Sequence, residues 1–298
     1  DDPADASGVR RRTIVEYAPS AEAVSRASVM RVCGATTTCG TNQEFRTEYT
    51  YWGNTRLPSR VRRVDGVTGQ VLDTDFAYDT AGRVTMEDGP LPGIADAKFF
   101  RYDVHGRRTW EIDATGTGNV RTARRHSYRD SDDKVTTTEE GTVSGPDATT
   151  LNVLRRTEFA YDARRNPSRE AAMTGTTTHT LVQRTFDQSN RLVCEARRMN
   201  PAVFGSVTDD ACALGPAGTG AHAFGPDRIT HNLYDAAGQL LQVQRAYRIT
   251  TANGFPTTHV QNYATYTKSL NGQRRTVTDA NGNRAELRYD GFDRLRCW

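Results

Sequence analysis

The chain has 298 residues, of which 36% are hydrophobic and 25% are charged. A soluble globular domain is usually about 45–50% apolar when glycine is counted, so this chain has little material for a dense core. It carries 39 lysine and arginine residues against 36 acidic ones. Because the two signs are interspersed, the sequence argues against nucleic-acid binding, which favours a concentrated basic patch. No apolar run approaches the ~18 residues of a membrane-spanning helix.

Residues 1–44 are expected to form a strand-rich or irregular N-terminal segment. The best helical pattern of the sequence lies there, in "SAEAVSRASVMRV" from Ser20 to Val32, and it supports one short helix at most. "CGATTTC" places Cys33 and Cys39 in a short loop. The chain begins with Asp1 rather than Met, so we expect a processed product or a fragment whose missing start could have carried a secretion signal.

Residues 45–298 repeat one hairpin pattern. Leu72, Thr74, Phe76 and Tyr78 alternate onto one face, "DTAG" follows, and Val84 and Met86 resume the alternation, which indicates a β-hairpin. The pattern recurs with a period of about 24 residues, and a period in that range is typical of repeat architectures. The clear aromatic anchors are Tyr78, Tyr102, Tyr161, Phe186, Tyr234 and Tyr289, and degenerate anchors are Tyr51, Tyr128 and Tyr266.

The residues after each anchor suggest how the turn is built. An aspartate follows every clear anchor (Asp79, Asp103, Asp162, Asp187, Asp235 and Asp290), and its side chain can hydrogen-bond the turn backbone. Gly82, Gly106 and Gly238 stand where the turn needs positive φ, and Asn166 and Asn190 are expected to replace them. After Tyr289 we expect the phase to be broken, since Phe292 and Asp293 stand where glycine is expected.

Two kinds of contact are predicted between hairpins. Arg83, Arg107 and Arg191 follow the turns and are expected to pair with an aspartate of the adjacent hairpin. Tyrosines at one strand position in successive hairpins are expected to stack as an aromatic ladder.

An insertion is expected at about residues 192–228. Phe186 and Tyr234 are 48 residues apart, which suggests one disguised hairpin between them. Cys194 and Cys212 lie in this stretch, and like Cys33 and Cys39 they are candidates for a disulfide formed in an oxidising compartment; buried free thiols are the alternative. Cys297 is left over, and its role stays open.

The recurring "YDxxGR" pattern, its period and "DANGNRAELRYDGFDRL" resemble the YD repeats of bacterial Rhs proteins, over roughly residues 45–298. The stretch from "LVCEARRMNPAVF" to "NLYDAAGQ" resembles a variant found in long YD-repeat proteins. The resemblance implies an all-β fold of consecutive antiparallel hairpins in a single spiralling, curled sheet that forms a hollow shell or tube. In several members that shell encloses a toxic domain.

The sequence offers no catalytic constellation. The six histidines lack the spacing of a metal site, and no GxSxG elbow is present. "DANGNRAE" from Asp279 lacks the glycine and glutamate positions of a calcium loop. A two-residue Asn-Gly turn explains it, and also Asn271–Gly272 and Asn253–Gly254.

We therefore expect a non-enzymatic structural protein without cofactors, secreted or on the bacterial cell surface, that builds the wall of a shell, tube or filament. Its expected partners are itself, as neighbouring copies or the rest of a longer repeat chain, and a glycan or an enclosed cargo. Two alternatives stay open: a fragment of a toxin-encapsulating Rhs shell, and a carbohydrate-binding surface module.

Overall fold

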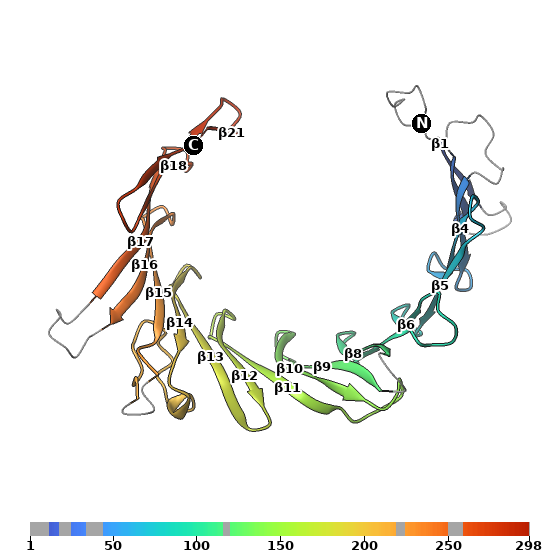
Figure 1. Cartoon of the computed structure of the whole chain (residues 1–298), viewed down its shortest axis with the longest axis horizontal. Coiled ribbons are helices and arrows are strands. Elements are labelled where there is room, and N and C mark those ends of the chain that lie inside the picture. Colours follow the sequence, from blue (N-terminus) through green and yellow to red (C-terminus); the bar gives the residue numbers. More distant parts are fainter. Residues whose placement is uncertain are drawn as a thin grey trace. The chain divides into compact units, whose positions relative to one another are not determined.

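The computed structural model describes residues 12–17, 25–33, 44–115, 120–218, 224–249 and 259–297. Nineteen strands, β1 to β19, form one sheet in which each strand pairs with its neighbours in the chain, and β20 and β21 form a separate two-stranded sheet (Figure 1). The strands pair with their neighbours in antiparallel fashion. The predicted all-β fold of consecutive antiparallel hairpins is confirmed.

The first strands are β1 (Arg12–Tyr17), β2 (Ala27–Cys33), β3 (Glu44–Tyr51), β4 (Pro58–Asp65), β5 (Val71–Tyr78), β6 (Val84–Asp88), β7 (Lys98–Tyr102), β8 (Arg108–Thr115) and β9 (Arg121–Arg129). They are followed by β10 (Lys134–Val143), β11 (Asn152–Tyr161), β12 (Pro167–Thr174), β13 (Thr177–Phe186), β14 (Leu192–Arg198), the 3-10 turn η1 (Pro201–Val203), β15 (Arg228–Tyr234) and β16 (Leu240–Ile249). The last strands are β17 (His259–Lys268), β18 (Arg274–Asp279), β19 (Arg284–Glu286), β20 (Arg288–Tyr289) and β21 (Leu295–Cys297).

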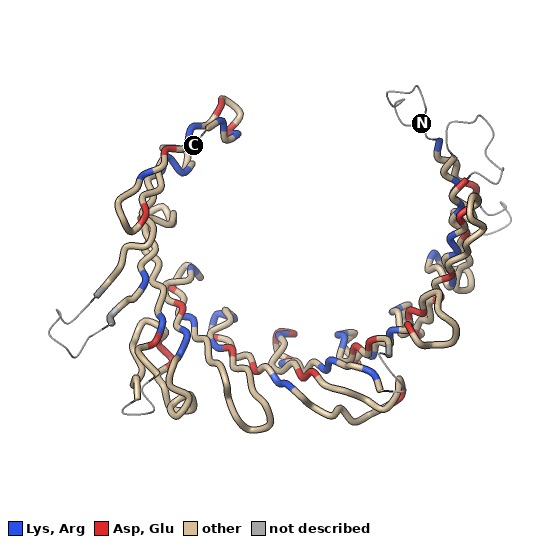
Figure 2. Tube along the Cα trace, in the orientation of Figure 1, with Lys and Arg blue, Asp and Glu red and all other residues tan. Residues whose placement is uncertain are grey.

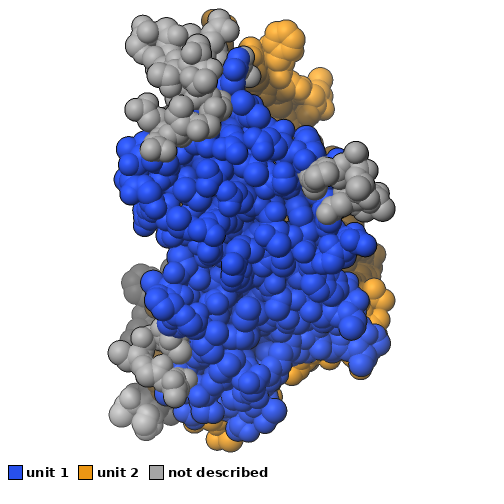
Figure 3. Space-filling model, turned by 90° about the vertical axis from the view of Figure 1, so that its right-hand side faces the viewer, with its two compact units in different colours: residues 1–126, 140–153 blue, residues 127–139, 154–298 orange. Residues whose placement is uncertain are grey.

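The chain divides into two compact units, coloured in Figure 3. Unit 1 comprises residues 1–126 and 140–153, and unit 2 comprises residues 127–139 and 154–298. None of the described residues belongs to a helix long and apolar enough to cross a membrane.

The expected short helix between Ser20 and Val32 is wrong where the structure describes it. Residues 27–33 form strand β2, which pairs with β1 on one side and with β3 on the other. The β-branched Val29 and Val32 suit a strand, and two partner strands satisfy its backbone, which outweighs a weak helical pattern.

Each hairpin with a clear aromatic anchor contains one β-bulge that the sequence did not reveal. Tyr78 pairs with Val84 while Ala77 pairs with Met86, so Thr85 is an extra residue on the second strand. Thr109, Ser168, Val193, Leu241, Arg275 and Arg296 are the extra residues of later hairpins. A bulge shifts the alternation of faces and increases local twist.

Hydrophobic clusters form where loops fold back onto the sheet. In unit 1, Trp110, Ile112 and Ala123 of β8 and β9 pack with Val143 and Leu151, which flank the loop between β10 and β11. In unit 2, the segment after β14 contributes Phe204 to one cluster and Ala211 to another. These clusters supply locally a second layer that the low apolar content did not lead us to expect.

The segment between β14 and β15 is an insertion rather than a disguised hairpin. Strands β14 and β15 pair directly with each other, and the described residues of 199–227 contain the turn η1 and no strand. The 48 residues between Phe186 and Tyr234 therefore include one long connection rather than a second hairpin. That 48 equals two periods of 24 residues is a coincidence.

Candidate functional site: the junction between successive hairpins

The aspartate of each motif organises a three-residue loop. Asp79 Oδ1 accepts hydrogen bonds from the backbone N–H groups of Ala81 (3.0 Å) and Arg83 (2.9 Å). The N–H of Gly82 donates to the carbonyl oxygen of Asp79 (2.9 Å), and Gly82 has a φ of 79°. This is a type I turn followed by a residue in the left-handed region, a common connection for hairpins.

The same loop recurs at Asp103, Asp162, Asp187, Asp235, Asp279 and Asp290. At Ser269 a hydroxyl oxygen replaces the carboxylate and accepts the N–H of Gln273 (3.0 Å). The predicted two-residue turns at Asn281–Gly282 and Asn271–Gly272 are therefore wrong, because each Asn-Gly pair ends a three-residue loop. Asn253–Gly254 lies outside the described residues.

The left-handed position is filled as predicted at some turns and differently at others. Asn190 has a φ of 59°, but in the hairpin of Tyr161 the residue with positive φ is Arg165 (70°) rather than Asn166. Asn166 instead stands where Arg83 stands, and its Nδ2 donates to Asp162 Oδ2 (3.0 Å). Asp293 has a φ of 62°, so the phase after Tyr289 is intact and a carboxylate residue tolerates the place of glycine.

In the hairpins of Tyr78, Tyr102 and Phe186, the arginine after the turn forms its ion pair with the aspartate of its own hairpin rather than with that of the adjacent one. Arg83 does reach the adjacent aspartate residue through the backbone, because its Nη1 donates to the carbonyl oxygen of Asp103 at 3.4 Å. Arg83 Nε lies 2.6 Å from Asp79 Oδ2, Arg107 pairs in the same way with Asp103, and Arg191 with Asp187. The backbone N–H of Arg83, together with its side chain, holds the pKa of Asp79 below its ordinary value. Because the aspartate is the fourth residue before the arginine across a tight loop, the local partner is closer than any in the next hairpin.

The guanidinium group nevertheless reaches the next hairpin through its face. Arg83 lies 4.8 Å from the ring centroid of Tyr102, and Arg191 lies 4.7 Å from that of Tyr234. A Cβ added at Gly106 would lie 3.2 Å from an Arg83 nitrogen. Glycine at this position therefore meets two needs, positive φ and the close approach of the preceding arginine.

The motif tyrosines donate their hydroxyl groups to the preceding hairpin. These hydrogen bonds run from Tyr51 to Ala27 O, Tyr78 to Pro58 O, Tyr102 to Val84 O, Tyr161 to Val135 O, and Tyr234 to Leu192 O. In pairs such as Tyr78 and Val84, the acceptor is the residue that faces the motif aromatic of that preceding hairpin. The predicted tyrosine-on-tyrosine ladder is therefore replaced: arginine faces cover Tyr51, Tyr102, Tyr161 and Tyr234, and Trp52 covers Tyr78.

Some predicted positions depart from this scheme. Phe186 pairs with Leu192 as a motif aromatic but has no hydroxyl to donate. In the hairpin of β17 and β18, Lys268 rather than Tyr266 occupies the motif position, since it pairs with Arg274 just before the turn at Ser269. Tyr289 pairs with Leu295 in the separate two-stranded sheet.

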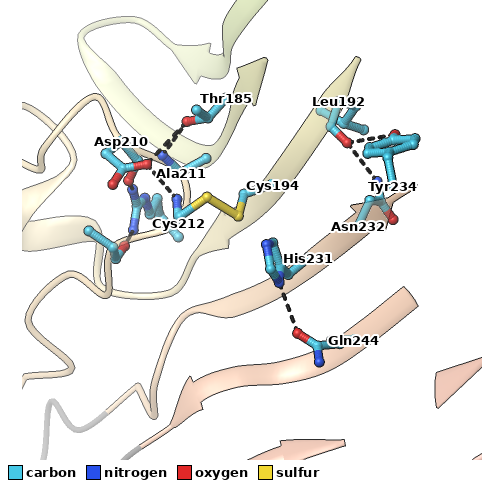
Figure 4. Close-up of a disulfide and its surroundings, with 12 residues drawn as sticks. Thr185, Leu192, Cys194, Asp210, Ala211, Cys212, His231, Asn232, Tyr234 and Gln244 are labelled. Carbon is cyan, nitrogen blue, oxygen red and sulfur yellow. Dashed lines mark hydrogen bonds between the residues drawn. A yellow bond between two sulfur atoms is a disulfide. The ribbon is translucent and has the colours of Figure 1, made fainter. Parts of the chain in front are cut away.

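A disulfide joins Cys194 of β14 to Cys212 of the insertion, as the sequence suggested (Figure 4). Cys194 is fully buried, and Ala211, next to Cys212, packs in the same cluster against Ala196 and Ile229 of the sheet. Cys33 is also disulfide-bonded, while its predicted partner Cys39 lies outside the described residues. Cys297 is a free, exposed thiol.

Sequence reasoning missed the buried arginine that organises the insertion. Arg198 Nη1 binds Asp227 Oδ2 (2.7 Å), and both side chains are almost fully buried. The remaining donors of Arg198 reach Gln183 and the carbonyl oxygens of Ala213 and Asp210. Asp227 in turn accepts the N–H groups of Met199 and Gly215. The sequence around Arg198 gave no sign that this side chain is buried. Its partners Asp210, Ala213 and Asp227 lie in the long connection between β14 and β15.

The described residues contain no group of three or more histidine, cysteine or acidic side chains that could hold a metal ion. Lysine and arginine are interspersed with acidic residues along the described trace (Figure 2). What the arrangement does supply, repeatedly, is mechanical linkage of one hairpin to the next.

No protein-family model matches the chain, and no curated protein matches it. Among solved structures, the crystal structure of TcdB2-TccC3 matches with a TM-score of 0.50 and 14% identity, over 91% of this chain and 14% of that one. TcdB2-TccC3 without its hypervariable C-terminal region matches at 13% identity over 98% of this chain and 17% of that one, with a TM-score of 0.34. This chain thus spans a small part of the length of these structures, and it shares a fold with TcdB2-TccC3.

Proposed function

We propose that this chain is a non-enzymatic YD-repeat protein that forms part of the wall of an extracellular or cell-surface shell. The observation that carries this proposal is the repeated junction: turn aspartate, arginine and tyrosine recur in successive hairpins and link each to its neighbour. Such nearest-neighbour linkage is how repeat proteins build extended structures from small units.

Two further observations support the proposal. The fold is shared with TcdB2-TccC3, a much longer chain of which this protein matches 14%. The Cys194–Cys212 disulfide suits a protein exported to an oxidising compartment, where such bonds persist.

Cryo-electron microscopy of the purified chain, prepared without reductant, tests this function. We expect thin-walled shells or filaments whose walls are one sheet thick, formed by one copy or by copies joined edge to edge. A matched variant, Arg83→Ala with Arg191→Ala, should disturb the walls, because it removes two junction side chains. Compact particles without an enclosed or extended wall in the unmodified protein would refute the proposal.

A second candidate is a segment of a shell that encloses a toxic domain. The low coverage of TcdB2-TccC3 favours it, since the shared fold is there embedded in a longer chain. Expression of the complete gene would distinguish the two: a downstream domain that stays protected from protease until the shell is opened supports an enclosing shell, and an empty wall supports a purely structural one.

A further inference from the structure

Two arginines face each other in the sheet, and neither forms an ion pair with a described residue. Arg197 of β14 and Arg228 of β15 are direct partners in the antiparallel ladder. Within the described ranges, neither side chain has an ion pair or hydrogen bond. Like charges directly opposite each other on a sheet destabilise it, so this pair requires an explanation.

Another arginine pair in the same sheet shows how the chain usually resolves this repulsion. Arg31 of β2 faces Arg46 of β3. Glu16 lies 2.8 Å from Arg31, Glu48 lies 2.6 Å from Arg46, and Glu44 contacts both guanidinium groups. Carboxylates therefore neutralise the first pair, whereas no described side chain forms an ion pair with Arg197 or Arg228, which are both exposed to solvent.

Arg197 and Arg228 border a cavity of about 470 Å³ in unit 2. A third arginine, Arg245 of β16, also lines it, and the ring of Tyr263, 3.6 Å from its guanidinium carbon, holds this side chain in place. Thr230 and Gln261 add neutral hydrogen-bonding groups to the lining.

Among the described residues that line the cavity, one is acidic, and its carboxylate already forms an ion pair. Glu195 lines the cavity, but Arg184 Nε donates to Glu195 Oε2 at 2.9 Å. Counting this pair as neutral, the lining carries three positive charges from Arg197, Arg228 and Arg245.

We propose that this cavity binds a phosphate or sulfate group. Guanidinium groups bind such oxyanions with two parallel hydrogen bonds and keep their charge at all physiological pH values. An anion between Arg197 and Arg228 replaces their repulsion with two attractions. The volume lies in the range of about 300–1,000 Å³ that is typical of small-molecule sites, so there is room for the group as a free ion or as an ester on a sugar-sized molecule.

Thermal unfolding of the full chain tests the site, with inorganic phosphate, inorganic sulfate and glucose 6-phosphate titrated against sodium chloride at constant ionic strength. We expect a saturable rise in melting temperature with the oxyanions, since a ligand that binds the folded state stabilises it. Tighter binding of glucose 6-phosphate than of inorganic phosphate identifies an ester as the better ligand, and equal binding identifies the bare oxyanion.

The variants Arg197→Gln and Arg228→Gln should weaken oxyanion binding about tenfold each, as expected for loss of a charged hydrogen-bond donor. Arg63→Gln is the matched control, because Arg63 is an exposed strand arginine outside the cavity. In chloride alone, Arg228→Gln should melt no lower than the unmodified protein, since it removes a like-charge pair. The proposal is wrong if chloride acts as well as the oxyanions, or if all three variants respond alike.

Discussion

The aspartate after each motif aromatic uses its two carboxylate oxygens for different purposes. In Asp103, Oδ1 accepts the N–H groups of His105 and Arg107, both at 2.9 Å, and Oδ2 pairs with the guanidinium group of Arg107. Asp103 thus closes the loop and also positions the side chain of Arg107. In the hairpin of Tyr78, the equivalent arginine, Arg83, contacts Tyr102 of the next hairpin through the face of its guanidinium group. This double use explains why serine at position 269 keeps the loop but cannot hold an arginine.

Replacing Asp103 by alanine should lower the melting temperature by about 2–4 °C, because a capping side chain is lost in a protein of this size. Differential scanning calorimetry measures the change. Asp147→Ala is the control, since Asp147 is exposed and has no bond within the described residues. Equal effects of the two substitutions would show that Asp103 does not organise its loop.

The turn aspartates also predict how stability depends on pH. Backbone and side-chain hydrogen bonds, led by the N–H of the following arginine, lower the pKa of Asp79, Asp187 and Asp290 in the folded chain. A carboxyl group with a lowered folded pKa stabilises the fold above its unfolded pKa, about 3.9, and this contribution is lost as the pH falls through the folded value. Stability measured by denaturant titration should therefore fall steeply below pH 4. A constant stability down to pH 2 would contradict this account.

At the scale of the element, a hairpin is completed by its neighbour. The residue just before the extra one on the second strand accepts a hydrogen bond from the tyrosine of the next hairpin, as the carbonyl oxygen of Val84 accepts from Tyr102. In Thr109 the bulged residue also donates its own hydroxyl to the carbonyl oxygen of Arg101 (3.2 Å). The bulge is therefore part of the joint between hairpins and not an irregularity of one strand.

Phe186 offers a test of this joint, because it lacks the hydroxyl. By the pattern of the other hairpins, its acceptor would be the carbonyl oxygen of Pro167, the residue that faces Tyr161. We expect Phe186→Tyr to stabilise the chain by about 0.5–1.5 kcal/mol, the usual net contribution of one hydrogen bond. Tyr102→Phe should destabilise it by a similar amount. Urea denaturation measures both, and a destabilising Phe186→Tyr would show that this joint differs from the others.

At the scale of the whole molecule, stability is expected to be local. In a repeat protein each unit contacts only its neighbours, so damage does not spread far along the chain. The Cys194–Cys212 disulfide closes a loop with a sequence separation of 18 residues. In the chain-entropy account, closing such a loop stabilises the folded chain by about 3 kcal/mol. This stabilisation belongs to the insertion, which packs on the sheet within unit 2.

The double variant Cys194→Ser with Cys212→Ser should therefore lose hydrogen-exchange protection in β13 to β15 and in residues 199–218. Protection in β7 and β8 of unit 1 should stay unchanged. Cys297→Ser serves as the control, since that thiol is free and exposed. Loss of protection in both units would show that the chain unfolds as a single cooperative body.

The sequence by itself determined the elements and their order. Alternation of apolar and polar residues, the aspartate after each aromatic and the glycines at Gly82, Gly106 and Gly238 are local signals, and each acts within a few residues. They sufficed for the all-β fold and for the disulfide between Cys194 and Cys212. They did not reveal the bulges, because an extra residue changes the pairing of two strands and leaves no mark in the composition of either.

Only the tertiary structure decided what each side chain contacts. Arg83 and Arg191 form ion pairs within their own turns and stack against the tyrosine ring of the next hairpin. Both contacts are possible because a guanidinium group has edges that donate hydrogen bonds and a flat face that stacks on aromatic rings. The insertion, the buried Arg198 and the unneutralised pair of Arg197 and Arg228 depend on residues far apart in the chain. Such contacts follow from the register of neighbouring strands and from where a long connection folds back, and neither is fixed by local pattern.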